Sequence, residues 1–260
     1  MKIVVLDGYT LNQGERDWEE LNELGEVTVH DRTVQEDVVR RAAGAEVVLT
    51  NKVVLNRSAI EHLPDLKYIG VLATGYNIVD LDAARERGIV VTNIPAYSTD
   101  SVVQMAFAHI LNIALRVGHY AREVQNGVWS AQPDFSYRDT PLIELKGKRI
   151  GLIGFGHIGQ AMAKVASAFG MKVVVCPHNM NMKLPKEYEK AKLNDVFSTC
   201  DIVSLHCPLT SETKEMVNSF RLSLMKQGAI LINTGRGGLI DEKALERALM
   251  ASRAAISKAN

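Results

Sequence analysis

The stretch "RIGLIGFGHIGQAMAKVASAFGMKVVV", residues 149–175, decides the fold. An apolar run over residues 150–153 is followed by a glycine-rich turn and then by apolar residues at helical spacing. These are Ile158, Met162, Val165 and Ala166. A second apolar run at 172–176 closes the stretch. Strand, helix and strand within about 30 residues predict a βαβ unit with two parallel strands.

The same alternation fills most of the chain and predicts an α/β fold. Before residue 98, strands are expected at 2–8, 26–31, 45–51, 66–73 and 89–95, with helices at 18–24, 36–43, 58–63 and 80–88. After it, strands are expected at 147–156, 171–176, 200–209 and 228–235. We therefore expect two doubly wound parallel-sheet domains, 1–98 and 99–260, the first flavodoxin-like and the second a Rossmann domain.

Between the two series lies a long helical pattern, residues 101–127, whose first half is apolar on nearly every face. A helix of this kind is buried all round, either inside a domain or against another subunit. We favour a subunit interface through residues 101–117, and therefore a homodimer, over an internal helix.

Composition excludes several classes of protein. The 260 residues hold 30 basic and 30 acidic side chains, so no nucleic-acid-binding surface is indicated. No run approaches the roughly 20 apolar residues of a membrane span, and the N-terminus "MKIVVLDG" is typical of a strand, not of a signal peptide. Cys176, Cys200 and Cys207 lack the spacing of a metal site or a disulfide framework. We expect a soluble cytoplasmic protein without a metal site.

Gly154, Gly156 and Gly159 form a G-x-G-x-x-G pattern between a strand and a helix. The first glycine allows a tight turn, the second lets backbone approach a pyrophosphate, and the third lets helix and strand pack closely. This predicts dinucleotide binding. The next strand ends at Pro177 and His178 without the acidic residue that binds a ribose hydroxyl, so NAD and NADP both stay open.

Five ordered stretches resemble the D-isomer-specific 2-hydroxyacid dehydrogenases, and within them the glycerate dehydrogenase (hydroxypyruvate reductase) branch. They are "VLATGYNIVD" (71–80), "NIPAYSTDSVVQMAFAHIL" (93–111), "GLIGFGHIGQAMAKVASAFGMKV" (151–173), "CDIVSLHCPLTSET" (200–213) and "GAILINTGRGGLIDEKAL" (228–245). The resemblance extends to about Arg253. It implies a substrate-binding domain at 1–98, an NAD(P)-binding domain at 99–260, and interconversion of a D-2-hydroxy acid with its 2-keto acid, glycerate and hydroxypyruvate above others.

The resemblance also implies the site residues. Arg236, between Gly235 and Gly237, matches the catalytic arginine, and a guanidinium suits that task because its planar fork stays charged and can hold two oxygens of a keto acid. The substrate carboxylate would meet Ala73, Thr74 and Gly75, with Asn77 nearby. The cofactor would meet Gly154, Gly156, His157, Ile158, Gly159, Cys207, Pro208 and Thr234.

From about Arg253 the sequence departs from the family. The resemblance implies a histidine, supported by a glutamate, that donates a proton, yet no histidine follows His206, and "AAISKAN" stands where a further strand is expected. We therefore expect a truncated or altered second domain, an exposed sheet edge, weak nucleotide binding and slow turnover. His206 is the remaining candidate proton donor. The alternatives are an inactive remnant and, less favoured, a dinucleotide-binding regulator of the same fold.

Overall fold

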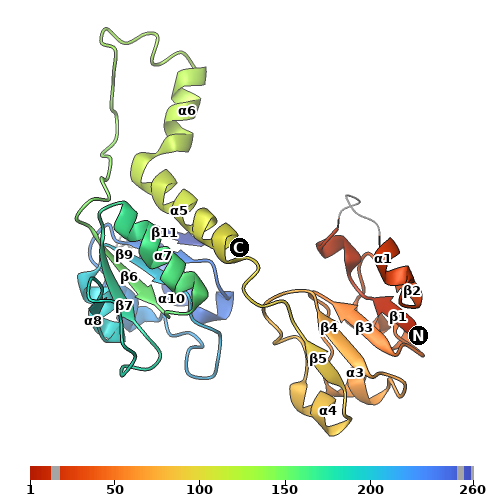
Figure 1. Cartoon of the computed structure of the whole chain (residues 1–260). Helices are drawn as coiled ribbons and strands as arrows, with labels where there is room; N and C mark the ends of the chain where they lie inside the picture. The colour runs from red at the N-terminus through yellow and green to blue at the C-terminus, as the bar shows by residue number, and fades with distance from the viewer. Residues whose placement is uncertain (13–17, 251–254, 259–260) are drawn as a thin grey trace. The chain divides into compact units, whose positions relative to one another are not determined.

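The computed structural model describes residues 1–12, 18–250 and 255–258. The chain divides into two compact units, Met1–Tyr97 and Ser98–Asn260. Each has its own sheet and its own core, and each is described by itself (Figure 1).

Unit 1 is a five-stranded parallel sheet in the order β2-β1-β3-β4-β5. The strands are β1 (Lys2–Val5), β2 (Glu26–Val29), β3 (Val47–Thr50), β4 (Tyr68–Val71) and β5 (Val90–Thr92). The helices are α1 (Glu19–Asn22), α2 (Val38–Arg41), α3 (Arg57–Glu61) and α4 (Leu81–Glu86). The side chains of Asn56 and Asp80 cap α3 and α4 by accepting hydrogen bonds from the backbone N–H groups of Ala59 and Ala83.

Unit 2 has a six-stranded parallel sheet in the order β11-β10-β9-β6-β7-β8. The strands are β6 (Arg149–Ile153), β7 (Lys172–Cys176), β8 (Glu189–Lys190), β9 (Ile202–Leu205), β10 (Ile230–Asn233) and β11 (Ala255–Lys258). The helices are α5 (Thr99–Leu115), α6 (Val117–Gln125), α7 (His157–Ala168), α8 (Leu193–Thr199), α9 (Ser219–Leu224) and α10 (Glu242–Met250).

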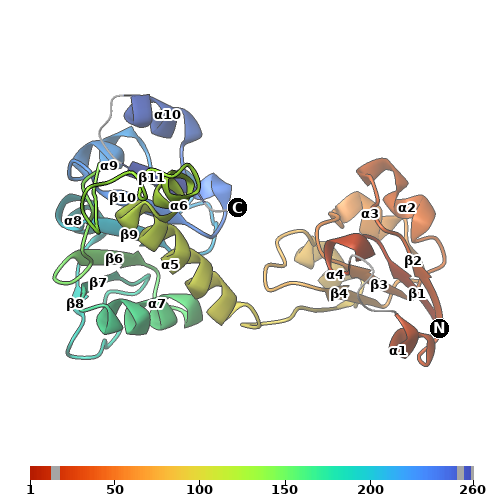
Figure 2. The same ribbon diagram turned by 90° about the horizontal axis from the view of Figure 1, so that it is seen from above.

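Helices cover both faces of the unit 2 sheet, and each face has its own apolar cluster (Figure 2). On one face α5 and α7 pack over β6 and β7; on the other lie α8, α9 and α10. Sheets covered on both sides require nearly continuous apolar strands, which is the pattern found in β6, β9 and β10. The predicted α/β fold with two parallel sheets is confirmed.

The long helix expected over residues 101–127 is broken, and that prediction was wrong. Arg116 adopts the left-handed conformation with φ 53°, and α5 and α6 meet there at a bend of 61°. The Asn112 side chain accepts a hydrogen bond from the backbone N–H of Gly118, which supports the break. Among the described residues, no single helix is long and apolar enough to cross a membrane; α5 and α6 taken together would qualify by length and composition, apart from their bend.

The apolar residues of α5 are covered largely from within unit 2. Val103, Ala106, Phe107, Ile110 and Ala114 are buried against α7 and the sheet. Contacts within unit 2 therefore bury these residues, whereas the sequence analysis favoured their burial against another subunit over burial inside the domain. The sequence analysis missed this cover because α7, which packs against α5, lies far from it along the chain.

The residues after Arg253 also differ from expectation. Ala255–Lys258 form strand β11, which pairs in parallel with β10. The sequence interpretation placed no strand there, because these residues do not match the family pattern. A backbone ladder needs extended residues with free N–H and C=O groups, however, and any side chains can meet that requirement.

Candidate functional site

The glycine turn, residues 154–159, joins β6 to α7. Gly154 has φ +96°, and a Cβ on it would lie 2.4 Å from the carbonyl oxygen of His206. A Cβ on Gly159 would lie 2.4 Å from the carbonyl oxygen of Gly154. Both distances are below contact limits and involve backbone, so the turn closes only with glycine at these two positions.

Gly156 differs from the other two glycines because its Cβ position is open, with no atom within 4 Å. Its φ of −75° is accessible to any residue, so backbone strain does not explain the glycine. Gly156 caps α7 without a side-chain hydrogen bond, and the first-turn N–H groups of His157 and Ile158 have no partner within the helix. An open space before uncapped N–H groups at the positive end of a helix dipole fits a phosphate.

The segment after β9 lies directly against the glycine turn. The backbone N–H of His206 donates to the carbonyl oxygen of Ile153, and a Cβ on Gly154 would be 3.0 Å from the nitrogen of Cys207. The carbonyl oxygen of Pro208 accepts a hydrogen bond of 2.7 Å from Thr213. Burial raises the pKa of the Cys207 thiol to about 11, so it stays protonated and neutral beside the turn.

The arginine loop, residues 234–238, follows β10 and is held by one buried amide. Asn233 is 2% exposed; its Oδ1 accepts from the N–H of Gly235 at 3.0 Å, and its Nδ2 donates to the carbonyl oxygen of Arg236 at 3.1 Å. The Arg236 side chain is exposed and makes no hydrogen bond or ion pair with any described residue. The guanidinium of Arg236 is therefore unpaired, while Asn233 holds the backbone that carries it, and such a group can bind an anion.

The arginine loop and the glycine turn share one edge of the sheet. Strand order places β9 between β6 and β10, and all three are parallel, so their carboxyl ends meet at this edge. A Cβ on Gly235 would lie 3.9 Å from the carbonyl oxygen of Leu205, and one on Gly238 would lie 3.0 Å from the Leu209 side chain. The structure thus brings Gly154–Gly159, Cys207, Pro208, Thr234 and Arg236 onto three neighbouring strand ends. Open parallel sheets bind ligands at such edges.

His206 is a poor proton donor in this structure. Its Nε2 lies 2.9 Å from the Oγ of Ser204, a residue with no exposed surface. Burial lowers the pKa of His206 to about 4, because the imidazolium would lose its hydration without gaining a negative partner. The ring is therefore neutral near pH 7, which weakens the hypothesis that it replaces the missing acid.

Unit 1 holds the other predicted residues in a loop after β4, residues 73–77. The carbonyl oxygen of Ala73 accepts from the N–H of Ile94, and that of Thr74 accepts from the Asn93 side chain at 2.8 Å. The backbone N–H groups of Thr74 and Gly75 donate to no described residue. Two free amides on a braced loop can receive a carboxylate. Asn77 is exposed and forms no hydrogen bond with the described part of the chain.

A buried carboxylate, missed by the sequence analysis, braces the neighbouring loop of unit 1. Asp7 follows β1, is 2% exposed, and accepts hydrogen bonds from the backbone N–H groups of Asn51, Lys52 and Val53 at 2.5–3.3 Å. The 51–53 loop continues from β3, which pairs with β4. Asp7 and Asn233 could have been noticed as polar residues ending apolar runs. The partners of Asp7 are set by tertiary structure, whereas those of Asn233 lie two and three residues further along the chain.

The comparisons with known proteins agree with this fold and geometry. Residues 107–257 match the D-isomer specific 2-hydroxyacid dehydrogenase, NAD binding domain. The chain is 46% identical over 259 residues to a hydroxypyruvate reductase from Blautia hydrogenotrophica, a match that covers 98% of this chain and 80% of the relative. The chain belongs to the D-isomer specific 2-hydroxyacid dehydrogenase family.

Two further matches extend the comparison. A glycerate dehydrogenase from Methylorubrum extorquens is 37% identical over 249 residues, which is 95% of this chain and 76% of the relative. Among solved structures, an acyclic imino acid reductase in complex with NADPH and D-Arg superposes with a TM-score of 0.84 at 30% identity, covering 99% of this chain and 83% of that one. The chain is therefore an oxidoreductase of the NAD(P)-dependent type, as its sequence motifs predicted.

Proposed function

We propose that this protein reduces a small 2-keto acid to its D-2-hydroxy acid and catalyses the reverse oxidation, with hydroxypyruvate and glycerate as its principal pair. One observation supports this above the others: the unpaired guanidinium of Arg236 lies on the same sheet edge as the open glycine turn. The relatives named hydroxypyruvate reductase and glycerate dehydrogenase support the choice of substrate.

The glycine turn is the proposed site for the cofactor pyrophosphate. The backbone N–H groups of His157 and Ile158 would donate to phosphate oxygens, and the open side of Gly156 leaves room for them. Cys207, Pro208 and Thr234 would border the cofactor from the neighbouring strand ends. When bound, the nicotinamide cofactor supplies the hydride for reduction and accepts it in the reverse direction.

Arg236 is the proposed catalytic residue. Its guanidinium would hold the carboxylate and the 2-oxygen of the keto acid with two parallel N–H donors. As the carbonyl oxygen gains negative charge, the fixed positive charge stabilises it more strongly than it stabilises the ground state. Asn233 is the positioning residue, because it holds the N–H of Gly235 and the carbonyl oxygen of Arg236 and so fixes the backbone that carries the arginine.

In unit 1 the free N–H groups of Thr74 and Gly75 are the proposed donors to a substrate carboxylate. Ala73 and Asn77 would lie beside them. Thr74 Oγ1 donates to the carbonyl oxygen of Ile94 at 2.9 Å, which turns this hydroxyl away from the role of an additional donor.

The proton donor is not assigned to a residue of this chain. The reaction needs an acid for the developing alkoxide, and His206 is neutral at the pH of interest. No histidine follows Arg236 within the 260 residues. A general acid contributes roughly 10²–10⁴ in rate, and a neutral His206 would not supply that contribution.

Cofactor choice is proposed to be permissive. Strand β7 ends at Cys176, and exposed His178 follows, with no acidic side chain between Cys176 and Lys183. Without a carboxylate there, a 2′-phosphate meets no repulsion and a ribose hydroxyl loses one acceptor. NADH and NADPH should bind with affinities within about tenfold of each other, since one hydrogen bond contributes roughly 1 kcal/mol.

The test of the proposed function has a binding arm and a turnover arm. Cofactor binding is titrated for the wild-type chain and for Gly156→Ala, which should keep its thermal stability yet lose affinity because the methyl group fills the phosphate space. Turnover is followed as NADH or NADPH oxidation with hydroxypyruvate and with glyoxylate. If Gly156→Ala binds the cofactor as tightly as the wild type does, the proposed phosphate site is wrong. If neither keto acid is turned over at any enzyme concentration, the proposed reaction is wrong.

We also propose a homodimer that uses α5 together with an arm, residues 116–142, which projects from the sheet of unit 2 (Figure 1). The arm exposes Val117, Val124, Trp129 and Leu142, and Phe135 is 91% exposed. Apolar groups gathered on one segment are typical of a protein interface. Light scattering should give the dimer mass for the wild type and for a control Val34→Lys, and the monomer mass for Val124→Lys. A monomeric wild type at micromolar concentration would contradict this proposal.

A cytoplasmic location is proposed from the three cysteines. Cys176, Cys200 and Cys207 are all free thiols and are buried or half-buried. Unpaired thiols are typical of a reducing compartment. Fractionation of the native cell should recover the protein with cytoplasmic enzymes, and recovery with secreted proteins would contradict the proposal.

A further inference from the structure

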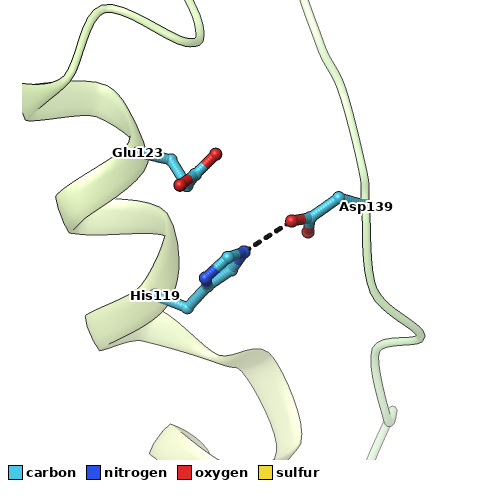
Figure 3. Close-up of side chains that lie close together, drawn as sticks. All are labelled: His119, Glu123 and Asp139. Atoms are coloured by element: carbon cyan, nitrogen blue, oxygen red, sulfur yellow. Dashed lines mark hydrogen bonds and ion pairs between the residues drawn. The ribbon is translucent and has the colours of Figure 1, made fainter.

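The arm contains a cluster of ligand-type side chains outside the site described above. His119 and Glu123 are four residues apart on α6 and so lie on one face of the helix, while Asp139 comes from the segment that returns toward the sheet (Figure 3). One ligand atom from each of the three residues lies within 4.8 Å of the others. His119 Nε2 is 2.6 Å from an oxygen of Asp139.

The cluster is not balanced as an ordinary ion pair. Asp139 has His119 as its partner, but Glu123 has no hydrogen bond or ion pair with any described residue, and its carboxylate faces that of Asp139 at close range. Two carboxylates against one imidazole leave excess negative charge when the ring is neutral. Like charges so close repel each other unless a cation lies between them.

Tyr137 provides an independent observation. Its hydroxyl oxygen is buried and has no hydrogen-bond partner within the described chain. The Tyr137 ring packs edge-on against Tyr120 with ring centroids 5.8 Å apart, and Tyr120 packs edge-on against His119 at 5.0 Å. Buried hydroxyl groups in folded proteins normally have a hydrogen-bond partner, and a water molecule bound to an ion would give the Tyr137 hydroxyl an acceptor.

From these observations we propose that His119, Glu123 and Asp139 bind one divalent transition-metal ion of the Zn²⁺ class. One imidazole and two carboxylates form a nitrogen–oxygen ligand set, and three protein ligands leave a position for water. Bonds of about 2.0–2.2 Å would hold the ligand atoms roughly 3–3.5 Å apart, and these atoms now lie within 4.8 Å of one another. The ion would replace the proton shared by His119 and Asp139.

The proposed ion would fix the arm and take no part in hydride transfer. It would join α6 to Asp139 and so close a loop of chain between positions 119 and 139. At about 100° per residue, His119 and Glu123 lie on the side of α6 opposite Val117, Ala121 and Val124. The ion would therefore hold the returning segment without occupying the apolar hollow that Val117, Ala121 and Val124 line.

The experiment measures metal binding by the full chain after treatment with EDTA. Calorimetry with Zn²⁺, and the visible absorption of added Co²⁺, should show one ion per chain. Asp139→Asn and Glu123→Gln should lose more than the roughly 10- to 100-fold in affinity that removal of a partner outside the ligand set costs. His62→Asn and Glu20→Gln, which change exposed residues of unit 1, are matched controls and should bind as the wild type does.

Two further readouts separate a metal site from a simple ion pair. EDTA should lower the melting temperature of the metal-loaded wild type and leave that of Asp139→Asn unchanged. Affinity should fall as the solution is made more acidic, because protons compete with the ion for the imidazole. Failure to bind Zn²⁺ or Co²⁺, or equal binding by both arm variants, would overturn the proposal. Neither result depends on dehydrogenase activity, so the proposed reaction is tested separately.

Discussion

Unit 1 and unit 2 each brace a loop with one buried polar side chain, and these two side chains differ in chemistry. In unit 1 the carboxylate of Asp7 accepts three backbone N–H groups; in unit 2 the neutral amide of Asn233 both accepts and donates. Both side chains are 2% exposed and both follow a strand. The 51–53 loop that Asp7 braces is held through its own backbone N–H groups, whereas the loop that Asn233 braces carries the free guanidinium of Arg236. A carboxylate beneath Arg236 would compete for its charge, whereas an amide leaves that charge to an anion.

The largest effect is expected from Arg236→Lys, which keeps the charge and removes the planar fork. Because a point charge cannot hold two oxygens in one plane, kcat/KM for hydroxypyruvate should fall by about 10²–10³. Calorimetry with oxalate in the presence of cofactor gives a second measurement that needs no turnover. A loss below tenfold would show that the guanidinium does not contact the substrate.

The next largest effect should follow Asp7→Asn in unit 1. The change removes one acceptor and turns an amide donor toward backbone N–H groups, so the free energy of unfolding of unit 1 should drop by roughly 3 kcal/mol. Urea denaturation measures this loss. Asp31→Asn, at an exposed position in the same unit, is the control. An unchanged midpoint would mean that the three hydrogen bonds contribute nothing net.

The reciprocal change, Asn233→Asp, should lower the stability of unit 2 by less than Asp7→Asn lowers that of unit 1. It should, however, weaken the binding of an anionic ligand. An added carboxylate oxygen would face the carbonyl oxygen of Arg236, which costs about 1–3 kcal/mol in unit 2. The new negative charge should also weaken binding of oxalate, while binding of cofactor changes little. If oxalate affinity stays the same, the explanation for an amide at this position is wrong.

The last prediction concerns His206 and pH. Its pKa is lowered to about 4 in the folded chain, so the unfolded state binds more protons between about pH 4 and 6.5. Stability should therefore be complete above pH 6.5 and fall as the pH drops toward 4, by at most about 1.4 kcal/mol per pH unit from this group. His206→Gln should flatten the profile in that window. A profile identical to the wild type would show that His206 does not titrate as described.

The sequence predicts what depends on local patterns and misses what depends on contacts between distant residues. Strand runs, the glycine turn and the position of Arg236 follow from periodicity and motif. The bend at Arg116 was missed because a left-handed residue other than glycine has no strong local signal. Asp7 and Asp139 find their partners through the fold, 44 and 20 residues away. The hydrogen bonds of Asn233 are local, so its role could have been read from the sequence as a polar residue beginning a glycine-rich turn.

Because the chain bends at the left-handed residue Arg116, the length of α5 determines the direction in which the arm points. Inserting a single amino acid ahead of Arg116 would swing everything beyond it by about 100° around the α5 axis. Related chains with longer or shorter versions of this helix could thus meet partners in new orientations while their nucleotide-binding sheets stayed the same.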